Sequence, residues 1–185
     1  MARTPSNMLE LGTEAPEFLL PNTVDQQDYS FIKTQGKKGT VVMFICNHCP
    51  YVKHVFKGIT SLAQDYQNKG VGFVAISSND IENYPDDSPE LMQQTAQEQG
   101  FTFPYLYDET QEVAKAYDAA CTPDFYLFDS EKKLVYRGQM DDSRPGNDIP
   151  VTGNDLRAAL DALLINSPID PLQKPSLGCN IKWKV

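Results

Sequence analysis

The chain has 185 residues, of which 41% are hydrophobic and 22% charged, as is typical of a globular domain with a sizeable core. Its formal net charge of −9, without any stripe of Lys and Arg, argues against a nucleic-acid partner, because phosphate binding needs clustered basic side chains. No stretch approaches the roughly 18 apolar residues of a membrane span, so we expect no membrane partner. The N-terminal stretch also lacks the apolar segment of a secretory signal, and we therefore expect a cytoplasmic protein.

The first part of the chain predicts an arm followed by the start of a domain. Residues 1–11 are expected to form a loosely ordered arm, and a single domain is expected to cover 12–165. The segment Gly12–Pro16 predicts a turn that enters a short strand over 18–20. The polar segment 25–38 carries a few aromatic and aliphatic residues, which fits either a hairpin arm or one helical turn.

The centre of the chain predicts a strand, a helix and a second strand. Thr40–Ile45 is a short apolar run rich in β-branched residues, and it leads into the pentapeptide Cys46–Pro50, CNHCP. Apolar residues then recur at helical spacing until Gly70, and Val71–Ser77 predicts another buried strand. A strand, helix and strand in this order imply a right-handed crossover and a parallel strand pair.

The second half of the chain predicts further helices and strands and ends in a tail. The tail is expected to cover residues 166–185 and contains Cys179. The elements expected before it are a helix capped by Ser88 that ends at Gly100, an edge strand within 101–107, a short helix from Asp108, an antiparallel hairpin of strands 125–128 and 134–138, and an amphipathic helix capped near Thr152.

The Cys46-Asn-His-Cys49 motif at the expected helix start is the strongest chemical signal. Unsatisfied N–H groups and the helix dipole favour negative charge at this position, so a thiol there ionises more easily and becomes nucleophilic. In a cytoplasmic protein such a pair is more often catalytic or metal-binding than structural. We predict a redox pair, with two inert cysteines as the alternative. His48 either lowers the pKa of a neighbouring thiol or is an exposed loop histidine.

The order of these parts resembles the thioredoxin fold. The motif Gly12-x-x-Ala-Pro-x-Phe-x-Leu20 resembles the opening of the alkyl hydroperoxide reductase/thiol-specific antioxidant family, the peroxiredoxins and their relatives. Thr122-Pro123 resembles the cis-proline that thioredoxins place opposite their cysteines. The resemblance covers about residues 8–165. It implies an α/β, thioredoxin-like three-layer fold with a central mixed sheet, an N-terminal extension and a C-terminal tail.

The resemblance also implies a role for each cysteine of the motif. When Phe44 is set on the strand phenylalanine of thioredoxins, Cys49 takes the position of their first cysteine and Val52 that of their second. Peroxiredoxins likewise follow their peroxidatic cysteine with a proline, as Pro50 follows Cys49. Cys49 is therefore the expected nucleophile and Cys46 the expected resolving cysteine. Peroxiredoxins carry threonine at the position of Cys46, which favours disulfide exchange over peroxide reduction here.

Further site residues follow from the same resemblance. Thr122 and Pro123 are expected to position an extended substrate segment by strand addition, the alternative being an ordinary turn. Arg137 and Arg144 are candidates for the arginine that peroxiredoxins use beside the thiolate. Cys179 is either a remote resolving cysteine that folds back from the tail or a thiol in a packed tail.

We therefore predict a cysteine-based antioxidant redox protein without a cofactor. The first hypothesis is a thiol–disulfide oxidoreductase that acts on a protein or small-molecule disulfide, with a thiol reductant such as a thioredoxin as partner. The second is a peroxidase that reduces hydroperoxides through Cys49. The third is a copper- or zinc-binding chaperone, for which two histidines confined to residues 48–54 are a poor ligand set. A homodimer is compatible with each of these hypotheses.

Overall fold

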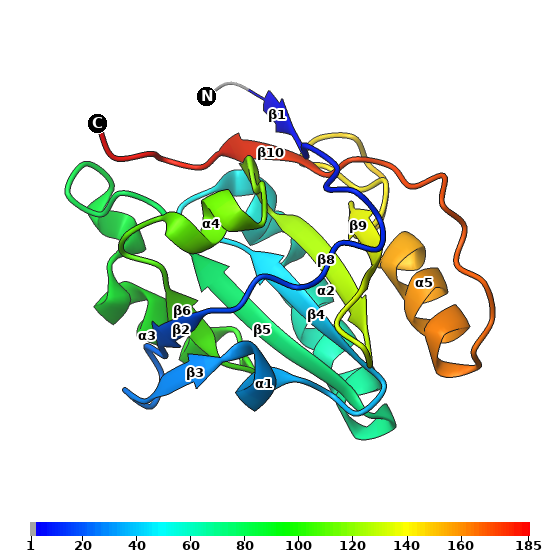
Figure 1. Cartoon of the computed structure of the whole chain (residues 1–185). Coiled ribbons are helices and arrows are strands. Elements are labelled where there is room, and N and C mark those ends of the chain that lie inside the picture. The colour runs from blue at the N-terminus through cyan, green and yellow to red at the C-terminus, as the bar shows by residue number, and fades with distance from the viewer. Residues whose placement is uncertain (1–2) are drawn as a thin grey trace.

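A computed structural model describes residues 3–185, and a five-stranded mixed sheet forms its centre (Figure 1). The strand order is β6-β5-β4-β8-β9, with β4, β5 and β6 parallel to one another and β8 and β9 antiparallel to their neighbours. The strands are β4 (Gly39–Phe44), β5 (Val71–Ser77), β6 (Tyr105–Tyr107), β8 (Asp124–Asp129) and β9 (Leu134–Gly138). The predicted parallel pair and the predicted antiparallel hairpin are both confirmed.

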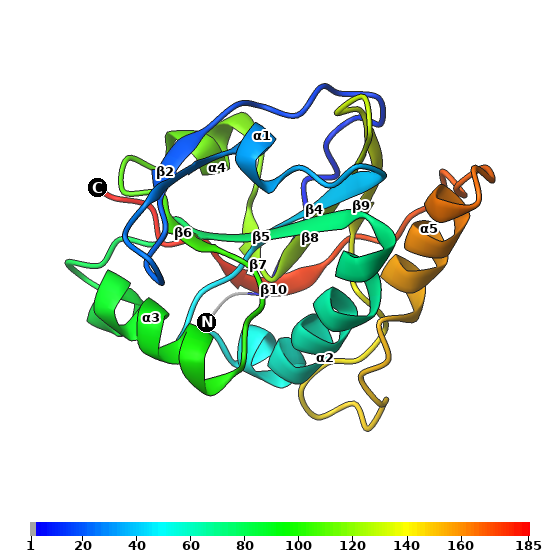
Figure 2. The same cartoon turned by 90° about the horizontal axis from the view of Figure 1, so that it is seen from below.

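Helices cover both faces of this sheet, which makes three layers (Figure 2). The helices are α1 (Phe31–Thr34), α2 (Pro50–Tyr66), α3 (Pro89–Glu98), α4 (Glu112–Ala116) and α5 (Asn154–Leu164). Buried residues of α2, α3 and α5 pack in one core cluster, and those of α1 and α4 in the other. The three-layer α/β architecture with a central mixed sheet is therefore confirmed. In the part of the chain that the structure describes, no helix combines the length and the hydropathy needed to cross a bilayer.

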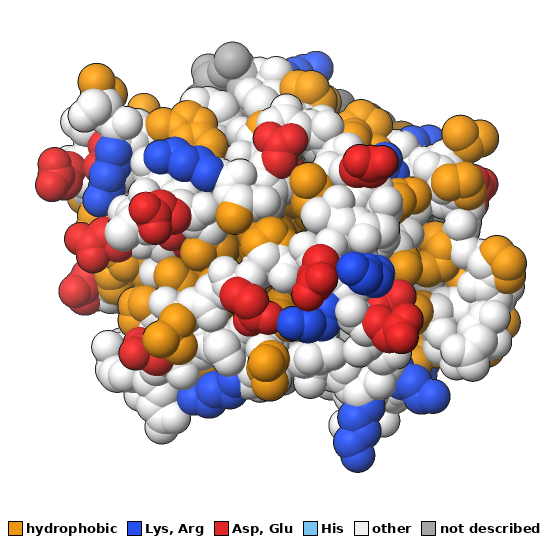
Figure 3. Space-filling model, viewed as in Figure 1, with side chains coloured by type: hydrophobic (Ala, Val, Ile, Leu, Met, Phe, Trp, Pro, Cys, Tyr) orange, Lys and Arg blue, Asp and Glu red, His pale blue; other side chains and the backbone are white. Residues whose placement is uncertain are grey.

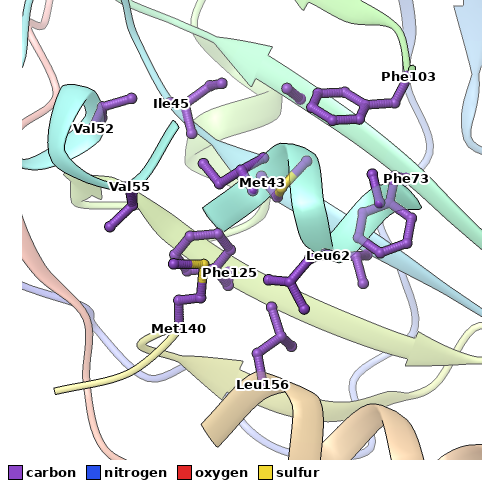
Figure 4. Close-up of a cluster of buried hydrophobic side chains, with 14 of the residues drawn as sticks. Met43, Ile45, Val52, Val55, Leu62, Phe73, Phe103, Phe125, Met140 and Leu156 are labelled. Carbon is purple, nitrogen blue, oxygen red and sulfur yellow. The ribbon is translucent and has the colours of Figure 1, made fainter. Parts of the chain in front are cut away.

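Strand β4 joins the two cores because its side chains alternate between the faces of the sheet. Met43 and, directly after the strand, Ile45 point towards α2, whereas Val42 and Phe44 belong to the opposite cluster. Figure 4 shows the α2 side, where Met43 and Ile45 lie among side chains of α2, β5 and β8. Fully burying one such aliphatic side chain contributes about 1.5–3 kcal/mol, so this packing fixes the strand that leads into the cysteine motif.

The ends of α2 and α3 follow the chemistry that the sequence predicts. Proline occupies the first turn of each helix, where a missing N–H costs no hydrogen bond. Ser88 caps α3, with its Oγ accepting from the N–H of Leu91 at 3.4 Å. Helix α2 continues into a 3₁₀ turn over Gln67–Lys69, and Gly70 ends it with φ of +92°, a conformation that glycine adopts without strain.

Residues 25–38 contain both structures that the sequence admits. Strands β2 (Leu19–Pro21) and β3 (Asp28–Ser30) form an antiparallel hairpin, and α1 follows directly as one helical turn. The helix expected from Asp108 starts later, at Glu112. Asp108 instead caps α4 from a distance, because its carboxylate accepts from the N–H of Ala114 at 2.9 Å.

The segments expected as an arm and a tail contain paired strands that the sequence analysis did not predict. Strand β1 (Arg3–Pro5) pairs with β10 (Leu177–Asn180), and β10 pairs with β7 (Cys121–Thr122), all antiparallel. Figure 1 shows β1 and β10 lying across the end of the main sheet, beside the start of β8.

The face of the molecule seen in Figure 3 carries acidic and basic side chains interspersed, without a continuous basic stripe.

Candidate active site

The two cysteines of the motif lie in the loop between β4 and α2. Cys49 is the N-cap residue of α2, and its carbonyl accepts from the N–H groups of Val52 and Lys53, each at 3.0 Å. Cys46 follows the end of β4 and is 1% exposed, while Cys49 is 0% exposed. The buried strand therefore delivers both thiols to the helix start, as predicted.

A third thiol, that of Cys179 on β10, meets them there. The Sγ atoms of Cys49 and Cys179 lie 2.6 Å apart, only about 0.6 Å more than the length of a disulfide bond. The Sγ of Cys49 lies 3.4 Å from the carbonyl oxygen of Thr122, and the Sγ of Cys46 lies 3.4 Å from Oγ1 of the same threonine. The structure places Cys179 against the motif, in a tail segment that also packs through the buried Ile181, so its position fits both alternatives and its resolving role stays a prediction.

The pKa of the Cys49 thiol is lowered to about 5. The largest cause is a hydrogen bond from the Cys46 thiol, and burial opposes it. The Cys179 thiol and the backbone N–H groups of Val52 and Cys179 add further hydrogen bonds to the sulfur. Hydrogen bonds to a charged group favour that form, so Cys49 is a thiolate at neutral pH.

The neighbouring thiols behave in the opposite way. Burial raises the pKa of Cys46, and its hydrogen bond to Cys49 raises it further. Burial likewise raises the pKa of Cys179 to about 12, again with a contribution from the hydrogen bond to Cys49. Cys121 is buried, its pKa is raised by burial, and its Sγ lies 3.9 Å from the carbonyl oxygen of Pro123. The site therefore holds one thiolate and two protonated thiols as its hydrogen-bond donors.

His48 forms a pair with Asp87, a residue that the sequence analysis did not single out. Its Nδ1 lies 2.6 Å from Oδ2 of Asp87, and this hydrogen bond is the largest cause of the raised pKa of His48. Asp87 is fully buried and also accepts from the N–H groups of Asn47 and His48 and from Nδ2 of Asn79. These hydrogen bonds outweigh burial and lower the pKa of Asp87. The carboxylate thereby fixes the loop that carries both cysteines.

Cys46, His48 and Asp87 also offer one potential metal-ligand atom each, all within 4.8 Å of one another. Both oxygens of Asp87, however, already accept two hydrogen bonds each, which occupies the lone-pair sites of the carboxylate. A metal ion would have to displace one of these donors. The donor set therefore fits a metal chaperone poorly.

The Thr122–Pro123 bond is cis, and it lies opposite the cysteines as the resemblance implies. Asp124 follows it and is buried, and burial raises its pKa to about 7. The Oγ of Ser6 donates to Oδ1 of Asp124 at 2.7 Å, and the phenol of Tyr126 donates to Oδ2 at 3.1 Å. The N-terminal segment is thus tied to the proline loop.

The arginine candidates are engaged elsewhere. Nε of Arg137 donates to the carbonyl of Leu9, and its Nη1 donates to Oε1 of Gln173, both at 2.8 Å. Arg144 donates to the carbonyls of Asp141 and Ser143, each at 2.7 Å. In the described part of the chain, neither guanidinium has a hydrogen bond to Cys49.

Comparison with known proteins adds a family and one named relative. The sequence profile of the AhpC/TSA family matches residues 11–137. Thiol-disulfide oxidoreductase ResA of Oceanobacillus iheyensis is 28% identical over 124 residues, which are 66% of this chain and 61% of ResA. The chain thus spans less than two thirds of the length of this relative.

Two solved structures are similar to this chain over most of its length. An uncharacterized conserved protein from Geobacillus kaustophilus has 61% sequence identity and a TM-score of 0.98, covering 100% of this chain and 97% of its own. Peroxidoxin BcpB from Mycobacterium tuberculosis shares 15% identity with a TM-score of 0.63, covering 83% of this chain and 96% of its own. The latter likeness concerns the fold, which is thioredoxin-like, as the resemblance implied.

Proposed function

The chain belongs to the AhpC/TSA family, and from this premise we propose that it is a thiol–disulfide oxidoreductase with Cys49 as its attacking thiol. The observation that carries the proposal is the setting of Cys49. Its thiolate is held at the start of α2 and is hydrogen-bonded to two protonated thiols. A thiolate is the nucleophile in disulfide exchange, and a nearby thiol can resolve the mixed disulfide.

The first step transfers one half of the substrate disulfide to the protein. The Cys49 thiolate attacks one sulfur of RS–SR′, the S–S bond breaks, and R′S⁻ leaves with the electron pair. The Cys46 thiol then loses its proton and attacks the Sγ of Cys49, which releases RS⁻. The protein dithiol is oxidised by two electrons to a Cys46–Cys49 disulfide, and the substrate is reduced to two thiols. A thiol reductant such as a thioredoxin returns the protein to its dithiol state.

Substitution of single cysteines tests this assignment. Cys49→Ser removes the nucleophile, and we expect at least a hundredfold loss in the rate of reduction of a small aromatic disulfide. Cys121→Ser is the matched control, because this thiol is equally buried, lies in the same region and has no step in the reaction. Retention of the full rate in Cys49→Ser would refute the proposal.

A peroxidase is the second candidate function, and the family match together with the Cys49-Pro50 pair favours it. Here the Cys49 thiolate attacks the O–O bond of ROOH, which gives a sulfenic acid and, after protonation, ROH. A neighbouring thiol then condenses with the sulfenic acid and releases water. Since both arginines are engaged elsewhere, the peroxide would lack their charge. Peroxide consumption with a thiol reductant, measured beside disulfide reduction, separates the two activities.

A copper or zinc chaperone is the remaining candidate, carried by the cluster of Cys46, His48 and Asp87. Metal analysis of protein purified without a chelator tests it. A stoichiometric metal content that disappears in His48→Ala would favour this candidate over the redox proposal.

A further inference from the structure

Strand β10 occupies the edge of β7 that adjoins the cis-proline. The pair is antiparallel, with Cys179 opposite Thr122 and Asn180 opposite Cys121. An exposed strand edge is where an extended peptide adds to a sheet by main-chain hydrogen bonds. The chain therefore fills, with its own C-terminal segment, the edge at which an extended substrate would bind.

The contact between β10 and the proline loop is close. A Cβ on Gly178 would lie 1.9 Å from the carbonyl oxygen of Thr122 and 3.2 Å from Cδ of Pro123, so no side chain fits at that position. The Oγ of Ser176 donates to the carbonyl of Pro123 at 2.5 Å. The next residue after this glycine, Cys179, places its sulfur 2.6 Å from that of Cys49.

This arrangement seals the reactive sulfur. Cys49 is 0% exposed although its lowered pKa makes it the thiolate of the site. Strand β1 lies on the outer side of β10, and Ser6 ties it to both Ser176 and Asp124. A protein disulfide cannot reach a sulfur that is covered in this way.

We propose that β10 is an internal substrate mimic that must detach before an external disulfide can react. The substrate that takes the place of β10 is an extended polypeptide segment in which a glycine directly precedes the reacting cysteine. The proposal rests on the disulfide-exchange function proposed above and adds to it the substrate class and the control of access.

The local structure provides a way to detach. Residues 170–172, upstream of β10, are exposed, with Leu172 at 88%, whereas Ser176 directly before the strand is hydrogen-bonded to Ser6 and Pro123. After the strand, Ile181 is buried and its N–H donates to the carbonyl of Ala120 at 3.0 Å. Lys182 is held on the same side, where its N–H donates to Oδ1 of Asn79 at 2.8 Å. Detachment from the N-terminal end therefore breaks the hydrogen bonds of Ser176, while Ile181 and Lys182 stay docked.

Substitution of Gly178 tests directly whether β10 covers Cys49. In Gly178→Ala the new methyl group collides with Thr122, and we expect alkylation of Cys49 by a bulky maleimide to accelerate by about tenfold or more. Gly72→Ala is the matched control, because its Cβ would lie 2.1 Å from the carbonyl oxygen of Thr34, a similar collision in the main sheet. Equal rates in Gly178→Ala and the unmodified protein, or equal acceleration in both variants, would overturn the proposal.

Two measurements support this test if Gly178→Ala does not fold. In the unmodified protein, amide hydrogens of residues 177–180 should exchange at least about tenfold faster than those of 71–77, because β10 opens without global unfolding. Exchange of both segments at one common rate would contradict a detachable strand. A peptide of residues 175–182, PSLGCNIK, linked by disulfide to a coloured thiol, should also react with the protein faster than the same peptide with Gly178→Ala. Equal rates for the two peptides would contradict the preference for glycine.

The proposed covering of Cys49 by β10 and the proposed disulfide exchange can be refuted separately. Alkylation and amide exchange need no turnover, so they report on β10 even if the protein reduces no disulfide. Conversely, full activity of Cys49→Ser would end the redox proposal without affecting either measurement of β10.

Discussion

At the scale of single residues, the hydrogen bonds around one sulfur atom decide the chemistry. Cys46 and Cys179 donate to Cys49, and their own thiols are kept protonated by burial. The helix start adds the N–H of Val52. The three cysteines therefore differ in role although each is buried and part of the same cluster.

The pH dependence of thiolate formation tests this division. Ultraviolet absorbance of the thiolate should rise around pH 5 in the unmodified protein, since Cys49 is the one thiol among the four whose pKa is lowered. Cys46→Ala removes the leading donor and should raise this pKa by about one to two pH units, while Cys46→Ser keeps a donor and should raise it less. An unchanged profile in Cys46→Ala would contradict the assigned cause, and Cys121→Ser should show no change.

The thiols of the site are predictable from the sequence, whereas the carboxylate that orders their loop is not. Cys46, Cys49 and His48 are adjacent in the chain, so their proximity follows from local spacing. Asp87 is one of several acidic residues in the polar loop over 78–88, and nothing in its neighbours distinguishes it. Its role depends on the packing of that loop against the cysteine loop, which is a tertiary contact.

At the scale of elements, the predictable parts are those whose patterns are local. Helix α2 and strands β4 and β5 agree closely with the predicted ranges, because each has a clear period and a turn or glycine at its end. Strands β1 and β10 are only three and four residues long, and they pair across almost the whole length of the chain. A periodic pattern of neighbouring residues cannot reveal such a distant pair, so the sequence does not predict that β10 covers the site.

The small sheet of β1, β10 and β7 should respond to pH through Asp124. Burial raises its pKa to about 7 from an ordinary 3.8, so the folded state binds the proton more tightly than the unfolded chain does. This contribution is complete below about pH 4 and is lost as the pH rises through about 7.

Asp124→Asn should remove that dependence. The free energy of unfolding of the unmodified protein should lose at most about 4 kcal/mol relative to the variant between pH 4 and pH 7. Denaturant unfolding at several pH values measures the difference, and subtraction cancels the other titrating groups. A difference that stays constant across this range would show that Asp124 does not titrate there.

At the scale of the whole molecule, the fold brings three distant segments to one end of the sheet. The cysteine loop, the cis-proline loop and the C-terminal strand meet there, and the N-terminal strand lies over them (Figure 1). The resemblance predicted the first two of these neighbours and left the place of Cys179 open. A cytoplasmic location and a homodimer stay predictions.

Identification of the cysteines that are linked after one turnover tests the central claim most directly. The reduced protein is mixed with one equivalent of a small disulfide, remaining thiols are alkylated, and the cysteines are mapped by mass spectrometry. We predict that every linked pair contains Cys49, with Cys46 as its partner. Substrate consumption that leaves Cys49 alkylated, or a Cys46–Cys179 bond, would contradict Cys49 as the attacking thiol.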